Sequence, residues 1–511
     1  MESNLNNNTN TSSSESYWMA NTTPPSFPEL NENVNTDVGI VGGGITGITT
    51  AYLLAKKGYN VAIIEADQII TGTTGHTTAK ITAQHDLIYD EFINHLGEEE
   101  AKQYYQANEE ALDFIKQKVK QSKIECEFKE EDAYIYATTN KKAQTIEKEA
   151  QAYETLGIDG QYVDQLPIDF SIQAGIVMKN QAQFHPIKYL THLVKELQNM
   201  GVQIFENTTA VDIIEGNEPK IVTKYGFQVT CKHVVSSSHF PFYDGKGLYF
   251  SRMYAERSYI VGGELKGEFA GGMYLSADKP KRSIRTANMN GKELLLIGGE
   301  SHKTGQGGSS LQHFQNLKDF GKENFGIDSY LYNWGAQDLI TLDKVPYIGQ
   351  LTSRHSNIFV ATGYRKWGMT NGTTAALLIS DLIQEKDNPY QDLFSPTRFY
   401  ADPSIKTFLS QNANVAAEFV KGKLSGGSKR AEDLRKDEGD TITYQNNQKA
   451  GGYRDTNGQL HIIDRTCTHL GCEVEWNDGE KTWDCPCHGS RFSYDGEVYE
   501  GPADKPLKKL N

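Results

Sequence analysis

Long apolar runs are absent from this sequence. None of its 511 residues falls in a stretch that approaches the roughly eighteen consecutive apolar residues of a membrane-spanning helix, so we expect no transmembrane segment. Residues 1–36 are rich in Asn, Ser and Thr, with neither an apolar h-region nor a twin arginine, and we read no export signal in them. We therefore expect a cytoplasmic protein in which residues 1–36 form a flexible N-terminal arm. Four apolar side chains of this arm could instead dock on the body: Tyr17, Trp18, Phe27 and Leu30.

Positive charge is also scarce. The chain has 51 Lys and Arg against 66 Asp and Glu, which gives a net charge of −15 and a pI near 5.4. No run of Lys and Arg interrupts this acidic balance. Surfaces that bind nucleic acid or anionic membranes need an excess of basic side chains, so we expect neither partner.

Cysteine is sparse, and four of the six cysteines fall within residues 467–490. The other two, Cys126 and Cys231, stand alone in the sequence and are expected to be ordinary buried thiols. The segment 467–490 contains two short boxes, CTHLGC (467–472) and CPCHGS (485–490).

Each box supplies one Cys and one His as metal ligands. Such a set can hold a [2Fe–2S] cluster, with two thiolates on one iron and two imidazoles on the other. The ligands in this assignment are Cys467, His469, Cys485 and His488. The alternative is a zinc site, but zinc fingers and ribbons favour a like pair, CxxC or HxxxH, on each arm.

The two boxes resemble those of the Rieske iron–sulfur family found in quinol–cytochrome oxidoreductases. The resemblance implies a disulfide between the remaining cysteines, Cys472 and Cys487, which clamps the two ligand loops. A disulfide is unusual in a reducing compartment, although the cluster loops could shield it. Residues 501–503 (Gly-Pro-Ala) resemble the proline loop that covers the cluster in this family.

Two residues near the boxes bear on the reduction potential. Ser490 resembles the serine whose hydroxyl bonds a bridging sulfide in high-potential members of the family. Phe492 stands where those members have a tyrosine that bonds a cysteine sulfur. Because hydrogen bonds to sulfur stabilise the reduced cluster, we expect a potential below the top of the Rieske range of roughly −150 to +300 mV.

Residues 38–65 have the pattern of a dinucleotide-binding βαβ unit. A short apolar strand (38–41) leads into a glycine-rich turn, a helix (48–57), a second strand (61–64) and an acidic residue, Glu65. The turn carries the G-x-G-x-x-G glycines, which let the backbone approach a pyrophosphate at the helix N-terminus. These glycines are Gly42, Gly44 and Gly47. Glu65 is expected to accept hydrogen bonds from the ribose hydroxyls. The alternative is a glycine-rich turn with no ligand.

The next segment, TGTTGHTTAK (71–80), resembles the flavin-contacting loop of flavoproteins related to D-amino-acid oxidase, a family that includes glycine oxidase and the sarcosine and dimethylglycine dehydrogenases. The resemblance implies that the dinucleotide is FAD and that His76 and Thr77 contact it. In the two dehydrogenases a histidine at the place of His76 is bonded covalently to the flavin. Here Gly75 replaces the usual tryptophan, so both a covalent link and a non-covalent contact stay open.

The same resemblance covers about residues 37–410 and suggests more distant FAD contacts. Val211 would lie against the adenine, and the start of a late helix would face the flavin pyrimidine through the backbone of Gly368, Met369 and Thr370. Residues 234–239 (VVSSSH) depart from the family's Ala-Thr-Gly turn near the pyrophosphate.

Candidates for substrate contact are fewer. Alternating strands over residues 248–300 suit a mixed sheet above the flavin, and they offer Tyr254, Arg257 and Tyr259. Amino-acid oxidases commonly carry an Arg where this chain has Asp338, and that Arg clamps a carboxylate. Asp338 would suit a cationic group such as an amine, although a purely structural aspartate is the alternative.

The sequence thus predicts an α/β protein: a Rossmann-like FAD domain with an interleaved mixed-sheet substrate domain over residues 37–410, a helix and linker over 411–431, and a small all-β Rieske domain over 432–511.

A flavin takes two electrons and a [2Fe–2S] cluster carries one. The presence of both cofactors on one chain therefore favours an FAD-dependent dehydrogenase. It would oxidise an amine or amino-acid-like molecule and pass electrons through the cluster to a protein or quinone acceptor. One alternative reverses the flow, with a donor protein reducing the cluster of a reductive or oxygen-handling enzyme. Another is a redox sensor or electron relay without an enzymatic activity.

Overall fold

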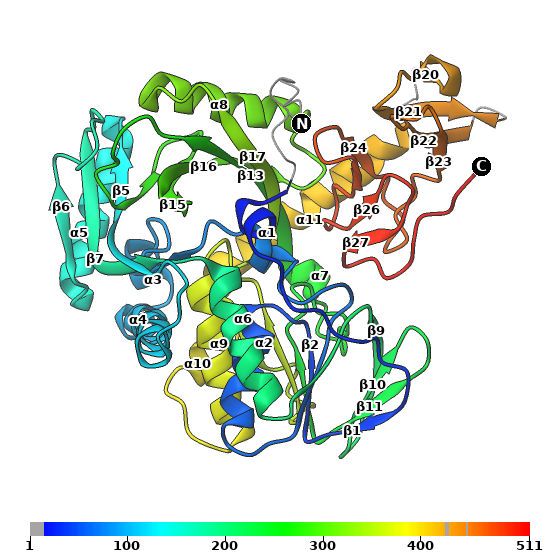
Figure 1. Cartoon of the computed structure of the whole chain (residues 1–511), viewed down its shortest axis with the longest axis horizontal. Coiled ribbons are helices and arrows are strands. Elements are labelled where there is room, and N and C mark those ends of the chain that lie inside the picture. Colours follow the sequence, from blue (N-terminus) through cyan, green and yellow to red (C-terminus); the bar gives the residue numbers. More distant parts are fainter. Residues whose placement is uncertain (1–14, 425–428, 446–447) are drawn as a thin grey trace, which may run out of the picture.

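A computed structural model describes residues 15–424, 429–445 and 448–511 (Figure 1). It contains a parallel-sheet layer, a large mixed sheet and a small C-terminal β domain, as the predicted fold class requires. Within the described ranges, no helix combines the length and the apolar character needed to cross a bilayer.

The parallel sheet has the strand order β18-β19-β12-β2-β3-β8. Its strands are β2 (Val38–Val41), β3 (Val61–Ile64), β8 (Gln203–Phe205), β12 (His233–Ser236), β18 (Tyr347–Gln350) and β19 (Ile358–Thr362). Every residue of β2 and β3 is buried, which is typical of a parallel sheet that is covered on both faces. The packed helices include α2 (Ile45–Ala55), α6 (Pro186–Asn199) and α9 (Gly368–Ile383). Except for β18, which pairs antiparallel with β19, these strands are parallel and run toward the edge where the glycine-rich turn lies.

The mixed sheet has the order β17-β13-β16-β15-β14-β5-β7-β4, with β6 also paired to β7. Its strands are β4 (Lys80–Ile81), β5 (Lys129–Ala137), β6 (Gly160–Val163), β7 (Ala174–Gln183), β13 (Met253–Glu264), β14 (Met273–Ser276), β15 (Arg282–Met289), β16 (Lys292–Lys303) and β17 (Tyr330–Thr341). Helices around it are α3 (Tyr89–His95), α4 (Glu98–Ser122), α5 (Asn140–Leu156), α7 (Tyr249–Arg252) and α8 (Ser310–Phe325). Helix α10 (Gln391–Phe394) packs instead on β18 of the parallel sheet. Strand β17 forms one edge of this sheet, and that edge faces the C-terminal domain.

A further small sheet, β1-β11-β10-β9, extends the parallel-sheet layer. Its strands are β1 (Val34–Asn35), β9 (Ala210–Ile214), β10 (Lys220–Thr223) and β11 (Gln228–Thr230). Residues 15–36, which the sequence placed in a flexible arm, pack on the body in the structure. Helix α1 (Tyr17–Asn21) buries Tyr17 and Trp18, so the docked alternative holds for this part of the arm. Residues 1–14 lie outside the described residues.

The C-terminal domain consists of two antiparallel-rich sheets, β20-β21-β22-β23 and β24-β25-β26-β27. Their bounds are β20 (Lys429–Arg430), β21 (Glu438–Tyr444), β22 (Gln448–Arg454), β23 (Leu460–Ile463), β24 (Glu475–Asn477), β25 (Thr482–Asp484), β26 (Arg491–Ser493) and β27 (Val498–Glu500), with a 3-10 turn η2 at Ala431–Asp433. Helix α11 (Ala401–Leu424), which departs from helical geometry at Asp402, leads toward this domain (Figure 1). Residues 425–428, part of the linker expected within 411–431, lie outside the described residues.

Candidate functional site

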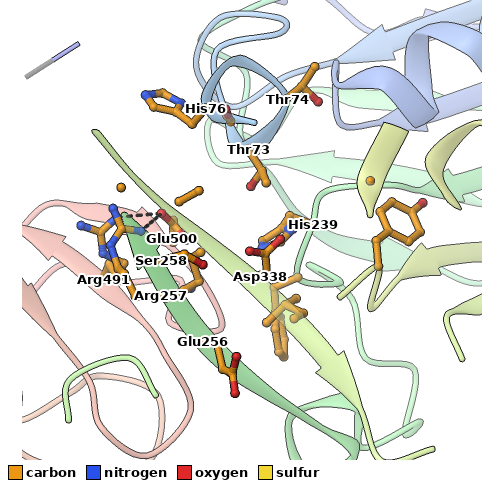
Figure 2. Close-up of a pocket in the computed structure, with 18 of the residues that line it drawn as sticks. Thr73, Thr74, His76, His239, Glu256, Arg257, Ser258, Asp338, Arg491 and Glu500 are labelled. Atoms are coloured by element: carbon orange, nitrogen blue, oxygen red, sulfur yellow. Dashed lines mark hydrogen bonds and ion pairs between the residues drawn. The ribbon is translucent and has the colours of Figure 1, made fainter. Parts of the chain in front are cut away.

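A single cavity of about 2390 Å³ runs from the glycine-rich turn to the C-terminal domain. Figure 2 shows Thr73, Thr74 and His76 on one side of it, and Arg257, Arg491 and Glu500 toward another. Most of the predicted FAD contacts line this cavity, namely Gly42, Gly44, Glu65, His76, Thr77, Val211, Gly368 and Met369. Gly47 and Thr370 do not. The Thr370 hydroxyl donates to the Thr82 carbonyl, 3.0 Å away, so its side chain turns from the cavity.

The glycine-rich turn has the close backbone packing that a pyrophosphate site needs. Gly42 adopts φ +109°, and a Cβ at Gly42 would lie 2.5 Å from the Ser237 carbonyl oxygen. At Gly47 a Cβ would lie 1.9 Å from the Gly42 oxygen. Both positions therefore exclude a side chain. Glu65 closes the turn, because one of its oxygens accepts from the Gly43 N–H at 2.8 Å, and burial raises the pKa of this carboxyl.

The predicted flavin-contacting loop is a 3-10 turn, η1 (Thr73–His76), covered by helix α1. The Ser16 hydroxyl donates to the Gly75 carbonyl at 2.6 Å, and the Trp18 indole N–H donates to the Thr77 carbonyl at 2.7 Å. A Cβ at Gly75 would already lie 3.1 Å from the sulfur of Met19. The N-terminal helix thus occupies the space that a tryptophan at position 75 would need.

Strands β13 and β17 lie between the flavin side of the cavity and the cluster loops of the C-terminal domain. Successive side chains of a strand point to opposite faces, and the register pairs Glu256 with Asp338 and Arg257 with Gln337. On one face, Glu256 bonds Lys366 at 3.2 Å. On the other, the Gln337 amide donates to the Gly489 carbonyl at 2.9 Å.

Arg257 therefore points toward the C-terminal domain, where it meets a buried charge cluster. Its guanidinium is 2 % exposed and binds both carboxylate oxygens of Glu480. Arg491 bonds Glu500 at 2.8 Å and Asp484 at 3.0 Å, and it lies 3.4 Å from Glu480. Arg257 was a candidate for substrate contact, but its side chain is committed to this ion-pair cluster.

The other substrate candidates have different surroundings. The ring of Tyr259 is buried, stacks on His313 with centroids 5.1 Å apart and hydrogen-bonds His302; this residue also lines the cavity. Tyr254 lines the cavity, and burial raises its pKa to about 12. Asp338 also lines the cavity, and burial raises the pKa of its carboxyl.

The two cluster boxes fold into matching loops. The Cys467 N–H donates to the Cys472 carbonyl at 2.7 Å, and the Cys485 N–H donates to the Ser490 carbonyl at 2.8 Å. The rings of His469 and His488 lie with centroids 5.0 Å apart at 89°. Each loop thereby contributes one imidazole to a facing pair and one thiol to a hydrogen-bonded pair.

These four side chains fit a [2Fe–2S] cluster. Cys467 and Cys485 are buried free thiols, and a hydrogen bond with Cys485 lowers the pKa of the Cys467 thiol to about 7. Nδ1 of His488 is buried and has no hydrogen-bond partner among the described residues, as expected of an atom reserved for a metal.

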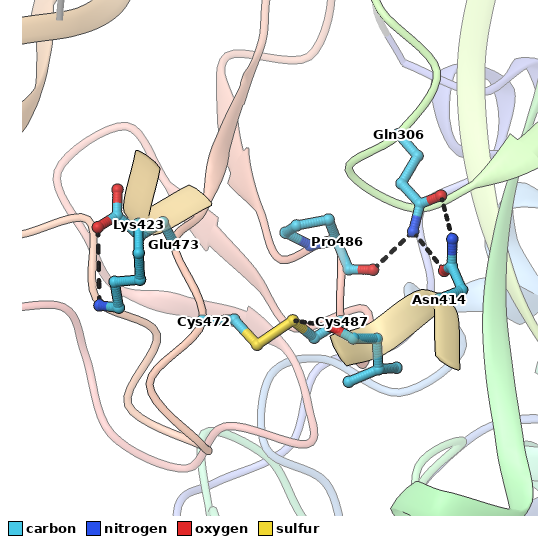
Figure 3. The surroundings of a disulfide bond; sticks show 8 residues. Gln306, Asn414, Lys423, Cys472, Glu473, Pro486 and Cys487 are labelled. Carbon is cyan, nitrogen blue, oxygen red and sulfur yellow. Dashed lines mark hydrogen bonds and ion pairs between the residues drawn. A yellow bond between two sulfur atoms is a disulfide. The ribbon is translucent and has the colours of Figure 1, made fainter. Parts of the chain in front are cut away.

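The predicted disulfide joins Cys472 to Cys487 across the two loops (Figure 3). The sulfur atoms of Cys472, Cys485 and Cys487 lie within 4.8 Å of one another. Because two of them form the disulfide, this trio offers one free thiol and is not a ligand set.

The histidine side of the cluster loops contacts residues outside the C-terminal domain. The ring of Phe250, in α7, lies 5.4 Å from the ring of His469 and 5.6 Å from that of His488. The Gln306 amide donates to the Pro486 carbonyl at 2.9 Å (Figure 3). Asp478 caps helix α8 by accepting from the Ser310 N–H at 2.9 Å. The cluster site is therefore docked on the mixed-sheet layer.

The sequence did not predict several ionisable residues that line the cavity, among them His239, Glu480 and Glu500. Glu480 and Glu500 lie in β-turn and strand segments that read as ordinary surface of a small β domain. For His239 a signal existed, since its segment departs from the family pattern.

The comparisons with known proteins agree with this geometry. Residues 37–382 match the family of FAD dependent oxidoreductases (DAO), and residues 429–511 match the Rieske [2Fe-2S] domain. The two matches identify FAD and a [2Fe–2S] cluster as the cofactors.

Individual proteins are similar over different lengths. YhfW of Bacillus subtilis (strain 168), named as a Rieske 2Fe-2S iron-sulfur protein, is 50% identical, with 97% of each chain covered. Gamma-glutamylputrescine oxidoreductase of Escherichia coli (strain K12) is 23% identical, over 75% of this chain and 91% of its own length. The crystal structure of glycine oxidase from Geobacillus kaustophilus superposes with a TM-score of 0.62 at 19% identity, over 72% of this chain and 100% of that one. The chain therefore belongs to the family of FAD dependent oxidoreductases of the amine and amino-acid oxidase type, and it carries a C-terminal Rieske [2Fe-2S] domain.

Proposed function

We propose that this protein oxidises an amine or amino-acid-like substrate at its FAD and passes the electrons one at a time through the Rieske cluster to an external acceptor, a protein or a quinone. The cluster would be held by Cys467, His469, Cys485 and His488. FAD would lie along the cavity from the glycine-rich turn to the start of α9.

The observation that carries this proposal is the thinness of the wall between the two sites. Tyr254 lines the flavin cavity, and the next residue on β13, Ala255, packs against the cluster loop, where a Cβ at Gly489 would lie 2.3 Å from the Ala255 Cβ. Phe250, three residues before β13, touches both histidine rings. A short protein path of this kind supports electron transfer from flavin to cluster within one chain.

The cavity chemistry supports a cationic substrate. Asp338 stands where amino-acid oxidases commonly hold a carboxylate through an arginine, and among the described residues the guanidinium of Arg257 is committed to Glu480. A buried carboxylate attracts an ammonium group. The similarity to gamma-glutamylputrescine oxidoreductase makes linear amines with a polar tail the first candidates.

An anaerobic titration of the full-length protein against a library of amines and amino acids tests the proposal. One amine should bleach the flavin absorption first, and the cluster absorption should follow. Reduction of the cluster by a ferredoxin or NAD(P)H system, without bleaching by any amine, would instead support the reverse flow. No turnover with any donor would favour a relay or sensor. A cytoplasmic location remains part of the proposal.

A further inference from the structure

His239 is the residue of the cavity whose chemistry the proposed function leaves unused. It follows β12 at the turn that departs from the family pattern, and it adopts φ +64°, a left-handed conformation that few residues other than glycine take. The Thr362 hydroxyl donates a hydrogen bond to the carbonyl oxygen of His239. The backbone therefore fixes this side chain at the cavity wall (Figure 2). Outliers of this kind concentrate at functional sites.

The ring nitrogen Nε2 of His239 is buried and has no hydrogen-bond partner among the described residues. Among the described residues, hydrogen-bond partners are also absent for Nη1 of Arg257, Nε of Arg365 and Oε2 of Glu500, which line the same cavity. Nη1 of Arg257 lies 3.7 Å from the other carboxylate oxygen of Glu500, as a longer ion pair. Buried polar atoms in native proteins are nearly always paired. Four buried atoms without a hydrogen bond in one cavity therefore indicate a site that is completed by a bound polar molecule.

The charges around His239 come from several elements. Asp338 lies on β17 and Glu500 on β27. A positive charge on His239 acts to lower the pKa of both carboxyls. Burial would raise the pKa of Glu500, but the positive charges of Arg491, Arg257 and His239 hold it below its usual range. The pair Glu256–Lys366 shares this part of the cavity.

The balance of these charges favours a cation. In the cluster behind Glu500, two guanidinium groups face the three carboxylates of Glu480, Asp484 and Glu500, which leaves one negative charge in excess. Either an imidazolium at His239 or an ammonium group of a bound molecule can compensate for it. Because an imidazolium at His239 and a bound ammonium group repel each other, we expect only one of the two to be charged at a time.

We infer that His239 is a catalytic proton acceptor: its Nε2 takes the proton of a substrate ammonium group that is held between Asp338 and Glu500. This inference rests on the proposed amine oxidation. The N–H bond of the ammonium breaks and an N–H bond forms at Nε2, so one proton moves, no electron moves and the total charge is unchanged. The product is the neutral amine, whose lone pair is needed before its C–H bond can be oxidised. Desolvation in the cavity disfavours the charged ammonium and lowers the basicity of the amine, which assists the transfer.

A binding experiment tests the site without turnover. Tetramethylammonium is a permanent cation with no proton to give, and its binding to the full-length protein can be followed through the flavin spectrum between pH 5.5 and 9. For the wild type we expect the affinity to rise at least tenfold with pH, as the repelling imidazolium disappears. In His239→Asn this rise should be absent. His192→Asn, which changes a histidine on α6 bonded to Glu196, is the matched control and should behave as the wild type. The same pH dependence in His239→Asn, or no binding to the wild type at pH 9, would overturn the inference.

A kinetic experiment separates proton transfer from a structural role. With an amine that bleaches the wild-type flavin, His239→Asn should reduce it roughly 10²–10⁴-fold more slowly at pH 7. The rate should return toward the wild-type value at pH 10, where the free base arrives without its proton. A loss that does not depend on pH would contradict a role in proton transfer. If no amine bleaches the wild type, the proposed function fails; if the variant and wild type are bleached alike, the inference alone fails.

Discussion

The cluster site and the flavin cavity are built in opposite ways. The cluster loops come from residues 467–490, close their own backbone hydrogen bonds and are braced by the Cys472–Cys487 disulfide. The cavity collects walls from segments between Val41 and Pro506, including the Rieske domain itself. The cluster site therefore depends on local sequence, whereas the cavity depends on how the Rieske domain is docked. Loss of the cluster should spare the flavin, but loss of the docking should disturb both.

The strongest test of this difference is Cys485→Ser. Removing one of two thiolates leaves an iron without its ligand, so we expect complete loss of the visible and paramagnetic signals of the cluster. The flavin should remain bound at the wild-type ratio per chain. Cys231→Ser, a buried thiol outside the boxes, is the control and should keep both cofactors. A Cys485→Ser protein that retains the cluster would refute the ligand set, and one that also loses FAD would refute the independence of the two sites.

Arg257→Ala should produce the next largest effect, because it removes the cation between β13 and the Rieske domain. Glu480 and Glu500 would stay buried without it, and breaking a buried ion pair in this way costs about 3–5 kcal/mol. Chemical unfolding, monitored separately by flavin and cluster absorption, should show both signals destabilised together.

Two further variants sharpen this test. Arg257→Lys should regain only part of the loss, since an ammonium cannot bind both oxygens of Glu480 as the guanidinium does. Arg435→Ala, an exposed arginine of the Rieske domain, should stay within about 0.5 kcal/mol of the wild type. Wild-type stability of Arg257→Ala would mean that this cluster does not hold the domain.

The same contact should give the protein a defined acid sensitivity. Burial opposes ionisation of Glu480, but Arg257 and Arg491 outweigh it and lower its pKa to about 2. A carboxyl with a folded-state pKa below its unfolded value stabilises the fold above the unfolded pKa of roughly 4.3, and this contribution is lost as pH falls toward the folded value. We expect at most about 3 kcal/mol to disappear between about pH 4.5 and pH 2. Unfolding midpoints across this range should fall less steeply in Glu480→Gln than in the wild type, while Glu432→Gln, at an exposed site, should change nothing. Equal slopes in all three proteins would contradict this account.

Most of the local architecture could be predicted from the sequence. The glycine-rich turn, the four cluster ligands and the disulfide depend on spacings of a few residues, and the structure brings each set together. What could not be predicted arises from docking. The pairing of Arg257 with Glu480 joins residues more than two hundred positions apart, and no sequence pattern around either residue predicts it. Helix α1 lies over the flavin loop because Gly75 leaves room for it, a relation that only the three-dimensional packing reveals.

The smallest expected effect concerns the tuning of the cluster by Phe492→Tyr. Phe492 is fully buried on β26 and belongs to the same core as Cys467 and Cys485. A buried tyrosine hydroxyl needs a hydrogen-bond partner, and a cysteine sulfur of the cluster is the acceptor that the Rieske resemblance assigns to it. A donated hydrogen bond stabilises the more negative, reduced cluster, so the midpoint potential should rise within the family range of roughly −150 to +300 mV. A potentiometric titration followed by the paramagnetic signal measures this shift, and Tyr499→Phe, at a largely exposed position, should leave the potential unchanged. An unchanged or lower potential in Phe492→Tyr would mean that the hydroxyl does not reach the sulfur, and that the tuning of this cluster comes from Ser490 and the backbone of its own loops.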